Sequence, residues 1–420
     1  MEMITTAGRQ KFLSKRIWPL FFLFLISVTP EVLGQQLETY IREAEQNNPE
    51  VQAYELRHDF ATEKINEVNT LPDTEFSAGY FVSEPETRTG AQRARFSVRQ
   101  MIPWFGTITA RENYATSMAD AEYVEVAMAK RKLALSVAQS YYRLYSMKAG
   151  QQVIGENIEL LDAYHELALN SLEVGSASAV DVLRLQMRQN ELARQKQTLE
   201  QDFEAEKVNF NNLLNRGEEM DIMLVDSMAI PQEEIIEDLE VAEVHPELLR
   251  FDRMFESVSE AELLNRKEAL PKLGFGVDYI PVAERTDMGV DENGKDILMP
   301  MVSVSIPIFN NKFRSVTRQN EIRQKEIQAQ RDDRLNKLET LLAATLNSRT
   351  SAKITAETFL RNIEQAKDAE EILLRSYETG TIDFNDVLDV QELQLKFQTG
   401  LIEAVKNYYQ QTAVVNYLTN

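Results

Sequence analysis

The stretch EVGSASAVDVLRLQ, residues 173–186, returns much later in the chain as ETGTIDFNDVLDVQ, residues 378–391. Gly175 of the first copy aligns with Gly380 of the second, 205 positions further on. In each copy a short turn containing glycine precedes a segment whose apolar residues have helical spacing, which is typical of a tight turn between two helices. The sequence therefore predicts the same helical hairpin twice.

Further matches in the same order extend the repeat. NPEVQAYELR is answered by HPELLRFDRM, LPDTEFSAGY by LPKLGFGVDY, and IPWF by IPIF; the pairs begin at residues 48 and 245, 71 and 270, and 102 and 306. Ordered self-similarity of this kind indicates an internal duplication. We expect the first repeat over residues 35–215, an acidic irregular linker over 216–243, and the second repeat over 244–420.

Each repeat predicts the same order of elements. A first helix, over 37–69 or 244–268, ends at a Leu-Pro pair, because proline stops a helix. A β-hairpin follows, over 74–102 or 272–307. A very long helix then leads to the turn near residue 175 or near residue 380, and a last helix returns.

The length of the long helices implies an elongated molecule. The first is expected from residue 107 to about residue 170, and at ~1.5 Å per residue it would be roughly 95 Å long. The first and the returning helix of a repeat, placed end to end, would match one long helix. Their apolar residues have coiled-coil spacing, which predicts paired helices with one buried seam.

The strand segments alternate apolar residues with polar or small ones. The apolar positions are Phe76, Ala78, Tyr80, Phe96, Val98, Phe275, Val277, Tyr279, Val302 and Val304. This pattern is typical of barrel strands that face lipid on one side and water on the other. A soluble hairpin with one face on a core is the alternative. Four strands do not close a barrel, so copies of the chain would share one, with eight strands from two copies or twelve from three.

Composition excludes several classes of protein. The chain has 420 residues, a net charge of −22 and no cysteine. The negative charge argues against nucleic-acid binding, and the lack of cysteine excludes disulfides, Cys-ligated zinc and thiol catalysis. The three histidines have unrelated spacings, and P-loop and GxSxG motifs are missing. We therefore expect no metal, no cofactor and no enzyme activity.

The N-terminus resembles an export signal. Basic residues precede an apolar run at 17–28, and we expect residues 1–34 to be a signal peptide that is cleaved before Gln35. A retained membrane anchor is the alternative. The rest of the sequence has no run of about 18 apolar residues, so we expect no membrane-spanning apolar helix.

The duplicated layout and several motifs resemble the TolC-like outer-membrane efflux channels. The motifs are the Leu-Pro pair before the first strand, NNPE at 47–50, QMIPWFG at 100–106 and YETGTIDFNDVLDVQ at 377–391. The resemblance implies a mostly α fold with membrane β: a homotrimer whose 12-strand β-barrel, with four strands per protomer, continues into a long α-helical coiled-coil tunnel. The barrel would lie in outer-membrane lipid of a Gram-negative bacterium and the tunnel in the periplasm.

The resemblance also implies a function and partners. The chain would be the passive exit duct of a tripartite efflux system, together with a periplasmic adaptor (membrane fusion) protein and an inner-membrane pump of the RND type. Two alternatives stay open: the exit channel of a type I protein secretion system, and a periplasmic coiled-coil structural protein without a pore.

By the same resemblance, residues of the second tip would form the pore constriction. Asp386 and Asp389 would narrow the mouth as carboxylate rings that favour cations, and Tyr377 matches a tyrosine that helps to hold the closed state. Pro103 and Pro307 would lie where strands become helices.

The tip turns would contact the adaptor through Gly175, Ser176, Gly380 and Thr381. Ser176 or Thr381, followed by an aspartate such as Asp181, would also cap the returning helix. The sequence departs from the family in one respect, because the arginine that closely follows the tip threonine in the family is missing here. The closed-state contacts of the family therefore do not transfer intact.

Overall fold

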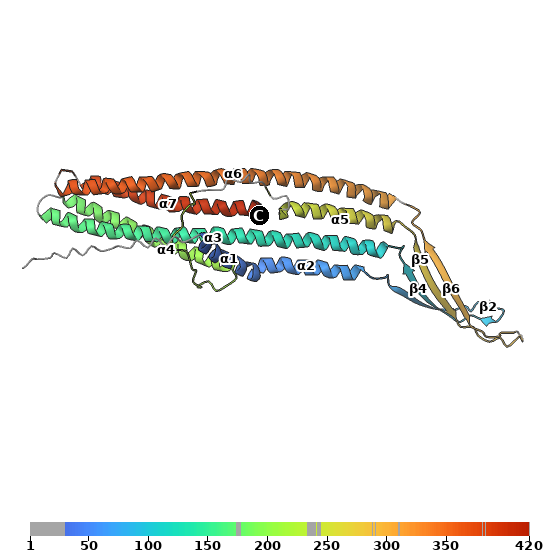
Figure 1. Ribbon diagram of the computed structural model, residues 1–420. Helices are drawn as coiled ribbons and strands as arrows, with labels where there is room; N and C mark the ends of the chain where they lie inside the picture. The colour runs from blue at the N-terminus through green and yellow to red at the C-terminus, as the bar shows by residue number, and fades with distance from the viewer. Residues whose placement is uncertain are drawn as a thin grey trace, which may run out of the picture.

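The structure is a computed structural model of the 420-residue chain. It describes residues 30–173, 178–232, 241, 245–287, 289, 291–309, 311–379, 381–382 and 384–419. The molecule is elongated, with helices side by side along most of its length and a small sheet at one end (Figure 1). The predicted signal peptide lies outside the described residues apart from its last five positions.

Seven helices account for most of the described chain. Their bounds are α1 Pro30–Asn47, α2 Pro49–Val68, α3 Thr107–Glu173, α4 Ala179–Leu213, α5 Pro246–Glu268, α6 Asn311–Glu378 and α7 Phe384–Thr419. The two long helices have 67 and 68 residues, which at ~1.5 Å per residue makes each roughly 100 Å long. None of the described helices is both long and apolar enough to cross a membrane.

The first helix differs from the expected continuous segment over 37–69. It is interrupted at Asn48, whose side-chain oxygen accepts the backbone N–H of Glu50 at 2.9 Å and caps α2. Pro49 occupies the first turn of α2, where a helix has no use for the N–H that proline lacks. Within the interior of a continuous helix the same proline would remove a hydrogen bond and break the helix. The Asn-Pro pair therefore divides the segment into α1 and α2.

Each long helix is covered by two shorter helices that follow one another along it. α2 and α4 both pack on α3, and α5 and α7 both pack on α6 (Figure 1). At the first joint, Asn48 Nδ2 donates to the carbonyl of Leu213 at 2.9 Å. At the second joint, His245 Nε2 lies 3.1 Å from the carbonyl of Tyr417. The first joint is the place where α4 meets α2, and the second joint is the place where α7 meets α5.

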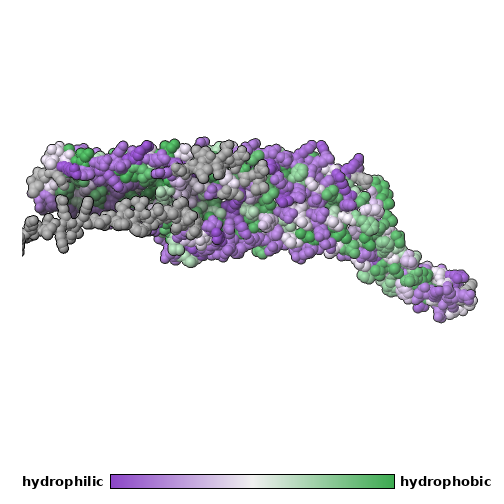
Figure 2. Space-filling view, viewed as in Figure 1, coloured by the Kyte–Doolittle hydropathy of each residue, from purple (hydrophilic) through white to green (hydrophobic). Residues whose placement is uncertain are grey.

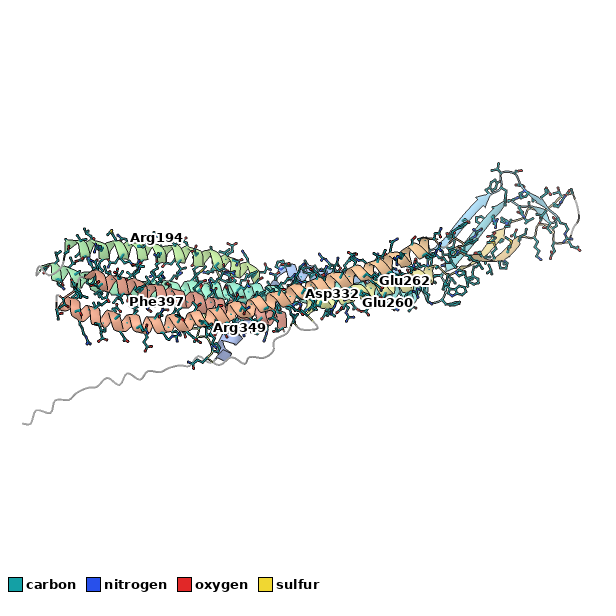
Figure 3. The ribbon with its side chains drawn as sticks, turned by 90° about the horizontal axis from the view of Figure 1, so that it is seen from above. Arg194, Glu260, Glu262, Asp332, Arg349 and Phe397 are labelled. Atoms are coloured by element: carbon teal, nitrogen blue, oxygen red, sulfur yellow. The ribbon has the colours of Figure 1, made fainter. Side chains whose placement is uncertain are left out.

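The α5–α6 and α6–α7 pairs are held by both polar and aromatic contacts. Glu262 of α5 accepts from Thr317 Oγ1 at 3.0 Å and from Asn320 Nδ2 at 3.1 Å, both on α6. Phe397 of α7 lies with its ring centroid 6.0 Å from that of Phe359 on α6. Figure 3 labels both residues: Glu262 lies nearer the sheet, and Phe397 lies toward the other end of the molecule.

The sheet has four antiparallel strands in the order β1-β4-β5-β6. Their bounds are β1 Thr74–Tyr80, β4 Ala94–Ile102, β5 Lys272–Ile280 and β6 Ile297–Ser305. The short strands β2 Glu86–Thr87 and β3 Gly90–Ala91 form a separate small hairpin. Because β4 pairs with β5, the two repeats meet in the middle of the sheet, and β1 and β6 are its edges.

One face of the sheet is apolar and exposed. Phe76 is 77% exposed, Val302 is 71% exposed and Leu298 is 70% exposed. On the opposite face Asp278 is fully buried and forms an ion pair with Arg95. Figure 2 shows the hydrophobic residues gathered over the sheet, with a hydrophilic end beyond them. The apolar face thus packs against no core of the described chain, unlike the face of a soluble hairpin.

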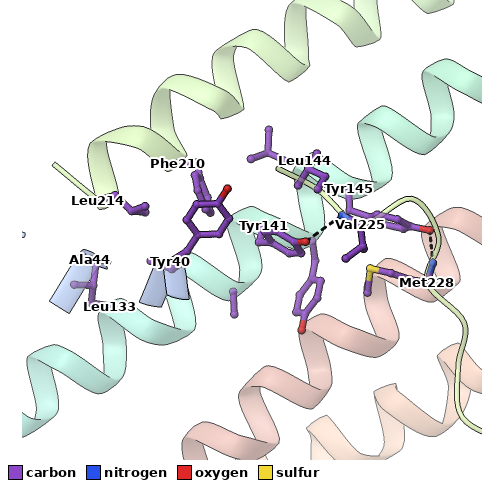
Figure 4. Close-up of a cluster of buried hydrophobic side chains, with 14 of the residues drawn as sticks. Tyr40, Ala44, Leu133, Tyr141, Leu144, Tyr145, Phe210, Leu214, Val225 and Met228 are labelled. Atoms are coloured by element: carbon purple, nitrogen blue, oxygen red, sulfur yellow. Dashed lines mark hydrogen bonds between the residues drawn. The ribbon is translucent and has the colours of Figure 1, made fainter. Parts of the chain in front are cut away.

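The largest core cluster lies at the first joint, where α1, α3 and α4 meet the residues that follow α4 (Figure 4). Tyr40 and Phe210 meet edge to face with ring centroids 5.1 Å apart. Three tyrosine hydroxyls accept backbone N–H groups of the linker: Tyr40 from Met223, Tyr141 from Val225, and Tyr145 from Met228. These bonds fasten the beginning of the linker to the helices.

Replacing Phe210, which is fully buried, should test this cluster. We expect Phe210→Ala to lower the free energy of unfolding by about 3–5 kcal/mol, because a large cavity opens among the tyrosines. Thermal and denaturant unfolding of the purified protein in detergent measures the change. Met220→Ala, at a half-exposed linker position, is the control and should stay within about 0.5 kcal/mol. Equal effects of the two variants would contradict the assignment of this core.

Candidate functional site at the hairpin tips

The ends of both helical hairpins share one hydrophobic core. Residues of α3, α4, α6 and α7 form it, and Leu161, Leu185, Phe384 and Val387 are each at most 1% exposed. Burying apolar side chains from both repeats in one cluster removes them from water together. The two tips are therefore packed as a unit within the chain.

Aromatic residues and one hydrogen bond join the two repeats at this core. The Phe384 ring lies between Tyr377, with centroids 4.9 Å apart, and Tyr164, with centroids 5.8 Å apart. Tyr164 on α3 donates its hydroxyl to the Glu370 carboxylate on α6. Burial raises the pKa of Tyr164, and the hydrogen bond to Glu370 raises it further. The hydroxyl is thus a neutral donor at physiological pH.

A buried chain of amides also crosses from the first repeat to the second. Gln391 is fully buried, and its Nε2 donates to Asn157 Oδ1 at 2.8 Å. Asn157 Nδ2 donates in turn to Gln398 Oε1 at 3.0 Å. Sequence reasoning missed this chain, although Gln391 belongs to the repeated motif. The aligned residue of the first repeat, Gln186, takes part in no such chain, because it lies near the surface beside His165.

The cap of the first returning helix is Ser178. The Ser178 hydroxyl accepts the N–H of Val180 at 3.1 Å, and the Asp181 carboxylate accepts the N–H of Ser178 at 3.1 Å. This reciprocal pair is a capping box. The capping role expected of Asp181 is confirmed. Ser176, which was expected to act with it, lies outside the described residues, as does Gly175.

At the second tip, Thr381 closes the helix before the turn rather than the helix after it. Its backbone N–H and its hydroxyl both donate to the carbonyl of Ser376, at 3.1 and 2.8 Å. The expectation that Thr381 caps α7 is wrong, because both bonds go to one carbonyl in the last turn of α6 and neither goes to α7. Gly380, the other residue expected to contact an adaptor here, lies outside the described residues.

The acidic residues expected at a constriction are exposed. Asp386 and Asp389 lie three residues apart near the start of α7, so their side chains share one side of the helix. No ion pair joins either one to another described side chain. Tyr377 lies at the end of α6 and packs against Phe384; it is 8% exposed, and its hydroxyl meets no hydrogen-bond partner in the described part of the chain.

Two arginines of α4 reach the same region of α7. Arg184 donates to the side-chain oxygen of Asn385, and Arg188 lies 3.9 Å from the Glu392 carboxylate. In the repeat Arg184 occupies the position that Asp389 has in the second copy, so at this position the first tip is cationic and the second is anionic.

The two prolines expected at junctions both lie between a strand and a long helix. Pro103 immediately follows β4 and is buried, and α3 begins four residues later. Pro307 follows β6 by two residues, and α6 begins at Asn311. Proline cannot donate to a sheet ladder, so both positions suit the end of strand pairing.

Metal ligation has no support among the described residues, where no group of three or more His, Asp and Glu side chains could hold an ion. The described tips instead offer a hydrophobic core, capped helix ends and exposed carboxylates. This arrangement provides surfaces for contact and for electrostatic selection. It contains no nucleophile paired with a base.

The structure thus defines a class of protein in which a helical hairpin occurs twice. Each copy is attached to half of one four-stranded antiparallel sheet, and one face of that sheet is apolar and exposed. A family model described as outer membrane efflux protein matches residues 40–215 and 253–419. The chain belongs to this family, whose members are transport channels and not enzymes. The two matched blocks agree with the internal repeat. A comparison with curated proteins finds no match.

Solved structures of outer-membrane channels share the fold. The outer membrane protein VceC from Vibrio cholerae is 16% identical, with a TM-score of 0.72 over 92% of this chain and 96% of that one. The outer-membrane channel OprN is 16% identical, with a TM-score of 0.74 over 92% and 90%. The open state of the MtrE outer membrane channel from Neisseria gonorrhoeae is 14% identical, with a TM-score of 0.68 over 91% and 88%.

The capping box at the first tip gives a direct test of the local structure. We expect Ser178→Ala to destabilise the start of α4 by about 1 kcal/mol, because the N–H of Val180 loses its acceptor. Hydrogen exchange of the first turn of α4 measures the loss. Ser178→Asp keeps an acceptor and should preserve the protection. If the alanine variant exchanges like the wild type, Ser178 is not the cap.

Proposed function

We propose that the chain is the outer-membrane exit duct of a tripartite efflux system and that it works as a homotrimer. One observation carries the proposal: a four-stranded sheet that exposes an apolar face and has two free edges, β1 and β6. A free edge in lipid leaves backbone groups unpaired at several kcal/mol each. Joining edges between copies pairs those groups, and three copies give twelve strands around a pore.

The polar face of the sheet fits the inside of such a barrel. Arg95 and Asp278 form an ion pair there, beside the buried Ser97. Along the same face β5 has Gly274 and Gly276, and both approach side chains of neighbouring strands closely. A water-filled interior accommodates charged and small residues, whereas lipid outside requires the apolar face.

The helical hairpins fit a tunnel wall. Each long helix is roughly 100 Å long, which exceeds the ~40–45 Å thickness of a whole bilayer. Most of the molecule would therefore project from the membrane into the periplasm, with the tips farthest from the sheet (Figure 1). An export signal over residues 1–34 would deliver the chain to that compartment.

The partners follow from the same arrangement. The chain offers no energy-coupling motif, so an inner-membrane pump, which we propose is of the RND type, would drive transport. A periplasmic adaptor would connect the pump to the hairpin tips near Gly175, Ser176, Gly380 and Thr381. Small and hydroxylated residues at these turns allow close approach of another backbone.

Two other functions are weaker. A type I protein secretion channel would use the same duct with another pump, so it differs in partner and substrate rather than in structure. A periplasmic coiled-coil protein without a pore would explain the helices. It would leave the apolar face over β1, β4, β5 and β6 exposed to water, and large apolar patches of that kind mark membrane or protein contacts.

Within this proposal, Asp386 and Asp389 narrow the periplasmic mouth. Both are exposed at the start of α7, and three copies would bring six carboxylates around one axis. Rings of carboxylates attract cations and repel anions. Tyr377, buried under Phe384, would support the wall behind them. Pro103 and Pro307 would mark the change from barrel to tunnel.

Crosslinking between edge strands tests the shared barrel. The chain has no cysteine, so Ser77→Cys on β1 and Ser303→Cys on β6 can be introduced without background. Oxidation should give a covalent trimer on a non-reducing gel, because each β1 would pair with a neighbour's β6. The structure of one chain does not fix which β6 residue would lie opposite Ser77 of a neighbouring copy. Met301→Cys and Met299→Cys therefore serve as further partners for Ser77→Cys.

Ser97→Cys with Ser303→Cys is the matched control for the crosslinks. Ser97 lies on β4, which is separated from β6 by β5, so this pair should not produce a trimer ladder. Monomer bands alone for every edge pair would rule out the shared barrel.

Planar-bilayer conductance tests the constriction. In Asp386→Asn with Asp389→Asn, we expect block by divalent cations to weaken by about tenfold, the change produced by losing roughly 1.4 kcal/mol of attraction. Glu219→Gln with Asp226→Asn removes the same charge from exposed linker positions and should leave the block unchanged. Equal block in both double variants and the wild type would exclude a constriction at these aspartates, although the duct itself would stand.

A further inference from the structure

The two joints occupy the same place in the two repeats but use different chemistry. Asn48 aligns with His245, and each residue precedes the proline that begins a helix, Pro49 in one case and Pro246 in the other. Each side chain does two things: it caps the helix that follows, and it donates to a carbonyl near the end of the returning helix. Only the histidine can gain a proton near neutral pH.

At the first joint, the amide of Asn48 performs both tasks. Its Oδ1 accepts the N–H of Glu50 at 2.9 Å, and its Nδ2 donates to the carbonyl of Leu213 at 2.9 Å. An amide does not titrate, so these two bonds are independent of pH.

At the second joint, the imidazole performs the same tasks in one tautomer only. Nε2 faces the carbonyl of Tyr417 at 3.1 Å, and a carbonyl only accepts, so Nε2 carries the proton. Nδ1 accepts the N–H of Glu247 at 3.3 Å. Adding a proton to Nδ1 would turn this acceptor into a donor that points at another donor. The cap of α5 would then be lost.

The surroundings disfavour a charged His245. The side chain is fully buried. Arg131 of α3 donates to the Tyr417 carbonyl at 3.4 Å, and Arg334 of α6 forms an ion pair with Glu247 of α5. Tyr417 of α7 also donates its hydroxyl to Glu247. Glu247, the carboxylate beside the imidazole in the described part of the chain, is therefore engaged by other groups, and two arginines would face the imidazolium.

Burial, the largest effect, lowers the pKa of His245 below its ordinary value of 6.5, and Arg131 and Arg334 lower it further; the Tyr417 carbonyl and Glu247 oppose this. A lowered pKa means that the unfolded or opened chain binds the proton more readily than the closed joint does. Stability of the joint is complete above about pH 6.5 and falls as the pH drops from there toward the folded-state pKa.

The second joint also has less apolar support among the described residues. Its cluster consists of Leu248, Leu338, Leu342, Val415 and Leu418. The cluster at the first joint is larger and contains four tyrosines and a phenylalanine. The polar bridge at His245 therefore contributes a larger share of the contacts that hold α7 against α5.

We propose that the second joint is an acid-sensitive element: protonation of His245 opens the contact between the end of α7 and the start of α5, while the first joint stays closed. Opening would free the end of α7 from the start of α5, while α6 stays packed on α5 through contacts such as those of Glu262 with Thr317 and Asn320. The inference is independent of the transport function proposed above, because it concerns contacts within one chain.

Hydrogen exchange followed by mass spectrometry tests the proposal on the purified full-length protein in detergent between pH 7.5 and 5.5. The informative peptides contain the first turn of α5, whose amides at Leu248 and Leu249 donate to the His245 carbonyl. After correction for intrinsic exchange, their protection in the wild type should fall by about tenfold per pH unit below about 6.5. The first turn of α2 should show no such fall.

His245→Asn is the matched variant, because it places at the second joint the side chain that the first joint already uses. It should keep protection of α5 at pH 7.5 and abolish its fall at acid pH. The reverse variant, Asn48→His, should make the start of α2 acid-sensitive, and it keeps the test decisive if His245→Asn fails to fold. The proposal is overturned if the wild type and His245→Asn lose protection equally, or if Asn48→His leaves α2 insensitive to acid.

Discussion

A helix of nearly seventy residues needs a partner along its whole length, and in this structure no single helix covers either long one from end to end. Each long helix is instead covered by two shorter helices, α2 and α4 on α3, and α5 and α7 on α6. Wherever two covering helices meet, one has carbonyls and the other N–H groups without helical partners. The side chain at each joint bonds a carbonyl of one covering helix and an N–H of the other, so the end-to-end alignment of the two covering helices depends on it.

The sheet imposes the second constraint. Because β4 pairs with β5, the two repeats are fixed to each other in its centre, and the unsatisfied edges belong one to each repeat. The strands are nine residues long at most, which matches the ~9–11 residues that cross a bilayer when tilted. The apolar face and the free edges thus find no partner within the described chain, and the homotrimer proposed above would supply one in lipid. The helical part buries its main clusters within one chain.

Much of this fold could be predicted from the sequence because its signals are local and occur twice. Alternation marked the strands, unbroken helical spacing marked α3 and α6, and the Leu-Pro and Gly turns marked the boundaries. The break at Asn48 was missed because coiled-coil spacing continues across it. The cap was placed two residues early, because the turn contains two serines, Ser176 and Ser178, and residue type does not distinguish them.

Contacts between residues far apart in the chain could not be predicted. The Asn157–Gln391 bond joins positions 234 residues apart, and the hydroxyls of Tyr141 and Tyr145 reach the linker more than 80 residues away. Neither residue type nor spacing distinguishes a buried glutamine from an exposed one on a helix with a polar face. The family resemblance supplied Asp386 and Asp389, but only the structure shows that both are exposed and that Tyr377 is buried against Phe384.

Because the chain is duplicated, each residue can be compared with the aligned residue of the other repeat, and positions that differ show where the two repeats have diverged. Asp181 is buried and caps α4, whereas the aligned Asp386 is exposed. The cationic Arg184 aligns with the anionic Asp389, and it is Arg184 that contacts the opposite hairpin. A carboxylate that serves as a cap is not free to meet an ion, so within the proposed duct it is the second repeat that would present acidic groups to the pore. The turn of the first repeat uses its aspartate as a cap, whereas the second repeat leaves both Asp386 and Asp389 exposed.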